Sequence, residues 1–136
     1  IPGADNRVVI AVGANDVDAD PGERPLSEGA SLEALGSMLD DAERLGASAF
    51  VIGPGPAREP AHDDAGRSLS RAFASLCERR RVPYLDLLDE LLADPDWNSG
   101  AEARDGVHPD AAGYAAYARL VVEHGFLDWL REPRGA

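Results

Sequence analysis

Three short apolar runs punctuate the chain, and longer segments with a different periodicity separate them. The runs are residues 8–12, 49–52 and 82–88, and the first two are rich in β-branched and aromatic side chains. Continuous apolar runs such as the first two are typical of strands that are buried on both faces of a parallel sheet. We therefore predict three strands at these positions.

The segments between the runs carry apolar residues three or four positions apart, which is the spacing of one helix face. We predict helices from Ser31 to a stop at Gly46, from Asp63 or Asp64 to just before Pro83, and from Asp110 to Gly125. Their apolar faces are Leu32, Leu35, Met38, Leu39, Ala42 and Leu45; Leu69, Ala72, Phe73, Leu76 and Cys77; and Tyr114, Tyr117, Ala118 and Val121.

Strands that alternate with helices in this way favour a parallel sheet with right-handed crossovers. The predicted fold class is α/β, with a three-layer α/β/α sandwich. Residues 18–29 are rich in Asp, Glu, Gly and Pro, and residues 53–56 are Gly-Pro-Gly-Pro, so we expect loops at both places. Between the third run and Asp105 we predict no element, only a polar stretch that contains Trp97, Asn98, Ser99 and Gly100.

A carboxylate precedes an imidazole by three positions in Asp105-Gly106-Val107-His108-Pro109. At this spacing the carboxylate can reach the near ring nitrogen, which leaves the far nitrogen free to take a proton. The pair is a candidate general base with its orienting group. The alternative is a loop end followed by a helix start, because proline suits the first helical turn.

A candidate amide donor follows the first strand in Gly13-Ala14-Asn15-Asp16. The carboxyl ends of the strands form the ligand-binding edge of open α/β sheets. There the Asn15 amide can donate to a developing oxyanion, while Gly13 permits a tight turn and Asp16 holds the loop. An Asx-type turn at a strand end is the alternative.

These two motifs, in this order and within this βα pattern, resemble the SGNH (GDSL-type) serine hydrolase family. The resemblance implies a serine esterase or lipase with His108 as base, Asp105 as its partner and Asn15 as an oxyanion-hole donor. It also implies a flavodoxin-like strand order 2-1-3-4-5, of which this chain holds strands 3, 4 and 5. The family's Gly-Asp-Ser nucleophile motif, and a glycine that is its second oxyanion donor, would lie upstream of Gly13.

We therefore expect residues 1–136 to be the C-terminal part of a single hydrolase domain. The N-terminal strands, about 60 residues at about 30 per βα unit, would come from a missing segment or from a second chain. Without strand 1, the first strand of this chain is expected to expose an apolar edge. Such a fragment is not expected to be a stable monomer.

The serines within the chain are not expected to replace the nucleophile. Ser31 follows Gly29-Ala30 without a preceding strand and is predicted to cap the next helix. Five further serines lack a strand-to-helix elbow: Ser48, Ser68, Ser70, Ser75 and Ser99.

Several residues beside the active edge are candidates for binding substrate, and most are apolar, as a small acyl group requires. Each has packing as its alternative, and Trp97 in particular can anchor the loop before Asp105. The candidates are Gly13, Val17, Pro54, Pro56, Trp97 and Val107.

The charge of −12 and the pI near 4.5 argue against nucleic acid or anionic membrane as partners. The one basic cluster, residues 79–81, is predicted to complement a helix C-terminus. No apolar run is long enough to span a bilayer. Single Cys77 is expected to be buried, and this cysteine usage is compatible with the cytoplasm. His62 and His124 are expected at the surface.

No zinc-ligand spacing is present, so we expect no metal site. The resemblance to a serine hydrolase implies a reaction without an organic cofactor. The sequence predicts a serine hydrolase that cleaves a small acyl ester through an acyl-enzyme. The alternative is a non-catalytic α/β binding or scaffold module that has the same fold and lacks the nucleophile.

Overall fold

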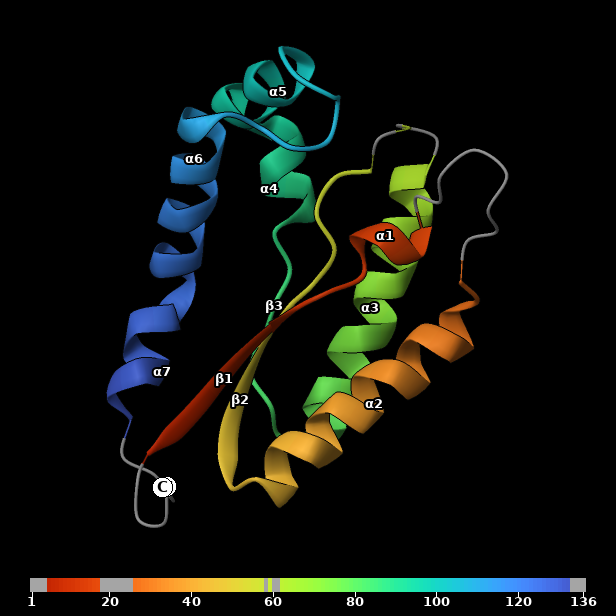
Figure 1. Cartoon of the computed structure of the whole chain (residues 1–136), viewed down its shortest axis with the longest axis vertical. Helices are drawn as coiled ribbons and strands as arrows, with labels where there is room; N and C mark the ends of the chain where they lie inside the picture. The colour runs from red at the N-terminus through yellow and green to blue at the C-terminus, as the bar shows by residue number, and fades with distance from the viewer. Residues whose placement is uncertain (1–4, 18–25, 58, 60–61, 133–136) are drawn as a thin grey trace.

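The computed structural model describes residues 5–17, 26–57, 59 and 62–132. These residues form a parallel sheet of three strands in the order β1-β2-β3 (Figure 1). The strands are β1 Asn6–Ala11, β2 Ala47–Ile52 and β3 Tyr84–Leu85. The first two runs are confirmed as strands. The third is a strand over only two of its seven residues.

Seven α-helices accompany the strands within the described residues, and a π-helical segment, Val122–Phe126, joins the last two. The helices are α1 Ala14–Val17, α2 Glu28–Arg44, α3 Asp63–Arg80, α4 Leu88–Ala93, α5 Pro95–Glu102, α6 Ala111–Val121 and α7 Leu127–Arg131.

Helices cover both faces of the sheet, so the predicted α/β/α sandwich is confirmed. α2 and α3 lie on one side of the strands, and α6 and α7 lie on the other (Figure 1). The core is accordingly divided in two. One half joins β1 and β2 to α2 and α3 through Ile10, Val51, Leu35, Leu39, Phe73 and Cys77. The other joins β2 and β3 to α4, α6 and α7 through Phe50, Ile52, Leu85, Leu91, Leu120 and Trp129.

The predicted apolar edge is visible on β1. This strand pairs with β2 through residues 6–11, and no described strand lies on its other side. Val9 is 44% exposed, whereas its register partner Phe50 on the inner strand is 4% exposed. Both residues are apolar and belong to the same sheet. Val9 is the more exposed of the two because β1 has a described neighbouring strand on one edge only.

The start of α2 corrects the prediction that Ser31 caps this helix. Ser27 is the N-cap, and its hydroxyl accepts a hydrogen bond from the amide of Ala30 at 3.2 Å. Ser31 lies one turn inside the helix and is 2% exposed. Both serines have the hydroxyl that a cap requires. The helix begins one turn earlier than predicted, so that Ser31 is its first buried residue and Ser27 is the residue at its start.

The prediction was also wrong between residues 86 and 102, where α4 and α5 replace the end of a strand and a polar loop. Asp86 ends the strand, because its carboxylate accepts the amide of Leu88 at 3.1 Å as α4 begins. Asp94 then caps α5 by accepting the amides of Asp96 and Trp97, with Pro95 in the first position. Asp-Pro is a helix-start signal that the sequence contained.

The helix after His108 has a different buried face from the one predicted. Its buried residues are Gly113, Ala116, Leu120 and Val121. Of the predicted face, Val121 is buried and Tyr117 is half-buried, but Tyr114 and Ala118 are exposed. Gly125, the predicted stop, has φ of +92° and breaks the helical geometry before α7.

Phe73 on α3 is the largest side chain with almost no exposure, at 1%. Replacing it by alanine is expected to lower the free energy of unfolding by about 3 to 5 kcal/mol, because it removes a ring from a close-packed core and leaves a cavity. Denaturant titration of the natural protein measures this loss. The exposed Leu45 is the control, since Leu45→Ala should cost less than about 1 kcal/mol. A similar cost for both variants would contradict the core assignment.

Candidate active site

The loop between α5 and α6 brings Asp105 and His108 into direct contact. The imidazole Nδ1 lies 2.8 Å from Asp105 Oδ2. The other carboxylate oxygen accepts the amide of His108 at 2.8 Å and that of Val107 at 3.0 Å. Gly106, at φ of +84°, makes the turn that allows one carboxylate to reach all three donors.

These bonds lower the pKa of Asp105 well below its usual range. The amide of His108 contributes most, followed by the His108 ring and the amide of Val107. Asp105 is therefore ionised at neutral pH and can only accept hydrogen bonds. It follows that Nδ1 of His108 carries the proton, and Nε2 is the free basic nitrogen.

The turn after β1 places Gly13 and Asn15 at the carboxyl edge of the sheet. Gly13 has φ of +108°, and a Cβ there would lie 3.0 Å from the Phe73 ring and 3.3 Å from Pro54. Glycine is thus required both for conformation and for space. Asn15 lies in the single-turn helix α1, and the turn is closed by the amide of Asp16, which donates to the carbonyl of Gly13 at 3.2 Å.

A pocket of about 520 Å³ contains Asn15 and His108 together, although they are far apart in the sequence. Four of the predicted binding residues line it, namely Gly13, Pro56, Trp97 and Val107.

Two other predicted binding residues have packing roles. Pro54 is fully buried against Gly13, and Val17 is part of the core between β1 and α3. Neither is among the residues that line the pocket. Both side chains are buried by tertiary packing, which sequence position alone does not reveal.

Two helix faces that were not predicted to border the site form walls of the pocket. On α2 the wall is Ser31, Ala34, Leu35 and Met38. On α6 it is Tyr114 and Tyr117, whose rings pack against Trp97 with centroids 6.2 Å and 6.0 Å apart. Burial raises the pKa of Tyr117. The helical spacing of Leu35, Met38, Tyr114 and Tyr117 is visible in the sequence, but the same spacing is typical of core packing.

The hydroxyl of Ser31 is buried and makes no hydrogen bond within the structure. It lies in the pocket wall, one turn inside α2, and no strand leads into it. This is not the sharp strand-to-helix turn that presents a nucleophilic serine. Ser31 therefore has the position of a wall residue.

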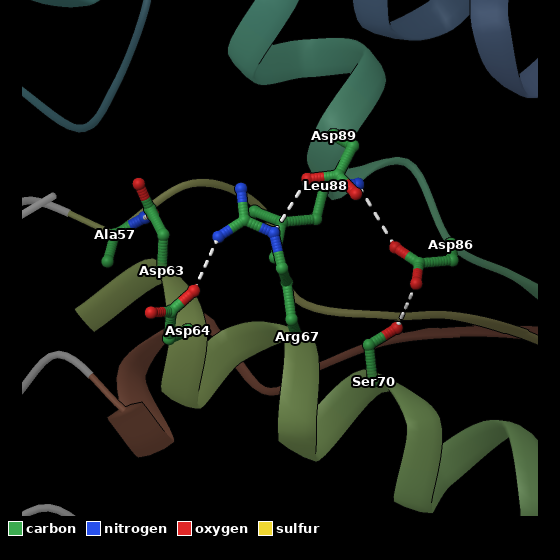
Figure 2. Close-up of polar contacts among 8 residues, drawn as sticks. All are labelled: Ala57, Asp63, Asp64, Arg67, Ser70, Asp86, Leu88 and Asp89. Atoms are coloured by element: carbon green, nitrogen blue, oxygen red, sulfur yellow. Dashed lines mark hydrogen bonds and ion pairs between the residues drawn. The ribbon is translucent and has the colours of Figure 1, made fainter. Parts of the chain in front are cut away.

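A second polar network lies between α3 and the start of α4, next to the end of β2 (Figure 2). Ser70 donates to Asp86 at 2.6 Å, and its oxygen is 2.7 Å from the hydroxyl of Tyr84. Burial raises the pKa of Tyr84, so this hydroxyl stays protonated and can donate to Ser70. On the outer side, Arg67 joins Asp64 on α3 to Asp89 on α4, at 2.9 Å and 2.8 Å. The network fixes α4 to α3, and it touches the pocket lining at Gly53, where a Cβ would meet the hydroxyl of Tyr84.

The other titratable residues singled out in the sequence lie away from this pocket. His124 is exposed and pairs with Glu90 at 2.8 Å, and His62 is half-buried before α3. Arg80 ends α3 as predicted and pairs with Asp40 at 2.6 Å. Cys77 is fully buried, and burial raises its pKa to about 11.

The part of the chain that the structure describes holds no cluster of three or more His, Cys, Asp or Glu side chains suited to a metal ion. Within the same residues, no helix is both long enough and apolar enough to cross a bilayer.

The sequence profile of the GDSL-like lipase/acylhydrolase family matches residues 2–116, which include both motifs. The chain therefore belongs to this family. No curated protein matches the chain significantly.

Solved structures with similar folds include three bacterial proteins. A candidate acylhydrolase from Bacteroides fragilis has 22% identity and a TM-score of 0.69 over 90% of this chain and 62% of its own. A GDSL-like lipase from Bacteroides thetaiotaomicron has 22% identity and a TM-score of 0.64 over 86% and 60%. A lipase/acylhydrolase from Enterococcus faecalis has 23% identity and a TM-score of 0.68 over 96% and 65%. The chain thus spans less than two thirds of each of these structures.

Proposed function

We propose that His108 is the general base and Asn15 one oxyanion donor of a serine ester hydrolase that cleaves small acyl esters through an acyl-enzyme. His108 takes the proton of a serine hydroxyl and then gives it to the leaving alcohol. Asp105 holds the imidazole in the required tautomer and stabilises its protonated form. Asn15 donates its amide N–H to the oxyanion.

The observation that carries the proposal is the Asp105–His108 bond in a pocket shared with Asn15. A bonded Nδ1 and a free Nε2 are what a general base requires. Asn15 lines the same pocket from α1, which follows β1, the strand farthest from the Asp105 loop in sequence. An Asp-x-x-His turn without a function would not be expected to share a pocket with Asn15.

The nucleophilic serine is proposed to lie in a part of the hydrolase outside residues 1–136. The family membership and the coverage of 60% to 65% of the similar structures support this. So does the open edge of β1, which borders the pocket through Ala11 and Val12. A strand placed there would end beside His108 and Asn15, because parallel strands share one carboxyl edge.

Asn15→Ala in the natural protein is expected to lower kcat for a p-nitrophenyl ester by about 10²- to 10³-fold, since it removes one oxyanion donor. KM should change little, because the donor acts mainly on charge that develops in the transition state. Steady-state kinetics measure both constants.

The matched control is Asn98→Ala, since the Asn98 amide is bonded to the carbonyl of Leu92 at 2.8 Å, outside the pocket. This variant should retain kcat. Equal kcat for wild type and Asn15→Ala would remove Asn15 from the mechanism.

The rival proposal, a non-catalytic binding or scaffold module of the same fold, makes the opposite prediction. Such a module hydrolyses no ester at a rate above the uncatalysed reaction. A panel of p-nitrophenyl acetate, butyrate and octanoate separates the two and gives the preferred acyl length.

A further inference from the structure

The base-bearing loop, residues 103–110, is anchored at one end by a buried proline. His108 and Asp105 have side chains that are 62% and 52% exposed, so their own packing does not fix where the imidazole lies. The next residue, Pro109, is fully buried. The position of His108 in the molecule therefore depends on what surrounds Pro109.

Gly113 on α6 lies directly against this proline. A Cβ at Gly113 would lie 2.4 Å from Pro109 Cβ and 3.1 Å from the carbonyl oxygen of Asp96 on α5. A separation of 2.4 Å is far inside van der Waals contact, so even a methyl group must displace Pro109 or one of the two helices. The φ of Gly113 is not positive, so the position requires space rather than unusual backbone geometry.

A second glycine makes the same kind of approach from α5. A Cβ at Gly100 would lie 2.9 Å from the amide nitrogen of Asp110 and 2.8 Å from its Oδ1. That oxygen caps α6 by accepting the amides of Ala112 at 2.9 Å and Gly113 at 3.2 Å. Helix α5 thus rests on the backbone that follows Pro109.

An ion pair joins the same two helices farther along. Arg119 on α6 bonds to Asp94, the N-cap of α5, at 3.1 Å, and the Asp94 side chain is only 12% exposed. The two helices that flank the loop are therefore held together at three places, two of which depend on glycine.

We propose that Gly100 and Gly113 are positioning residues: they let α5 and α6 meet at Pro109 and Asp110, and so fix the His108 imidazole opposite Asn15. The expected change in kcat rests on the proposed hydrolase function, whereas the expected displacement of Pro109 and His108 rests on packing alone. Neither glycine needs to touch the substrate.

Gly113→Ala is expected to lower kcat by about 10- to 100-fold with KM within about twofold, because a displacement of the base by about 1 Å misaligns proton transfer. Helix propensity alone predicts no loss of activity and a more stable α6, since alanine is a better helix former than glycine. The matched control is Gly36→Ala in α2, where nothing lies within 4 Å of the added methyl. This control should keep both constants and unfold at the same or a higher temperature.

A readout independent of catalysis is the titration of the Asp105 carboxyl carbon by NMR. In the wild type the three bonds to Asp105 hold its pKa low. In Gly113→Ala we expect the pKa to move toward its usual value, because displacement of Pro109 pulls His108 away from the carboxylate. A role in stability alone would leave this titration unchanged in the folded variant.

Gly100→Ala adds a methyl group on α5 against Asp110, next to Pro109. This variant replaces Gly113→Ala in the test if Gly113→Ala does not fold. A fall in kcat with retained KM in either folded variant supports the proposal, and unchanged kcat in both overturns it. If the wild type hydrolyses no ester, the proposed function fails, and the Asp105 titration still decides about the glycines. An unchanged titration in both variants then overturns the positioning role.

Discussion

Replacing His108 by alanine in the natural protein is expected to lower kcat for ester hydrolysis by a factor on the order of 10⁴ to 10⁶. The imidazole is the only side chain of the pocket lining that combines a free basic nitrogen with a bonded orienting carboxylate. Without it the serine hydroxyl keeps its proton and is a weak nucleophile at neutral pH.

The fold should survive this change, because the His108 side chain is 62% exposed and its removal leaves no cavity. Circular dichroism and denaturant titration check this point. His124→Ala is the matched control, since that histidine is also exposed and bonded to a carboxylate, Glu90, but lies outside the pocket. Equal activity of His108→Ala and His124→Ala would overturn the assignment of the base.

Asp105→Asn is expected to lower kcat by up to about 10⁴-fold through the tautomer of His108. The amide oxygen of asparagine can still accept the main-chain bonds from Val107 and His108. Its NH₂ group, however, donates toward Nδ1, which favours the tautomer with the proton on Nε2. That nitrogen then cannot act as a base. Steady-state kinetics, with loop geometry checked by crystallography, measure the effect.

The same variant should change how stability depends on pH. Because the pKa of Asp105 is lowered in the folded protein, its carboxylate contributes stability above its usual pKa of about 3.9. That contribution is lost as pH falls through the folded-state pKa. The difference in unfolding free energy between wild type and Asp105→Asn should therefore be largest near neutral pH and shrink below about pH 4. A difference that grew on acidification would contradict the bonding described for Asp105.

The parts of the fold that the sequence predicted correctly are those with a local signal. The apolar runs at residues 8–12 and 49–52 became the paired strands β1 and β2, of which β2 is the buried one. Asp105 and His108 interact because they are only three positions apart. A bond of this kind needs only a turn, and Gly106 supplies it.

Other features depend on contacts between distant residues and were not predicted. Ser27 and Ser31 are both good caps, and only the packing of α2 selects Ser27. The walls of the pocket could not be predicted because they depend on the relative placement of α2 and α6, which lie on opposite faces of the sheet (Figure 1). Likewise, nothing local to Gly113 reveals that Pro109 and Asp96 leave no room for a side chain.

The central claim is that His108 and Asn15 serve a serine nucleophile in the natural protein. The most direct test is the intact mass of that protein before and after treatment with a fluorophosphonate serine probe, with peptide mapping of the labelled site. The account predicts a gain of one probe mass on a serine outside residues 1–136, and much slower labelling in His108→Ala. An unlabelled protein, or one labelled on a serine within these residues, would contradict it.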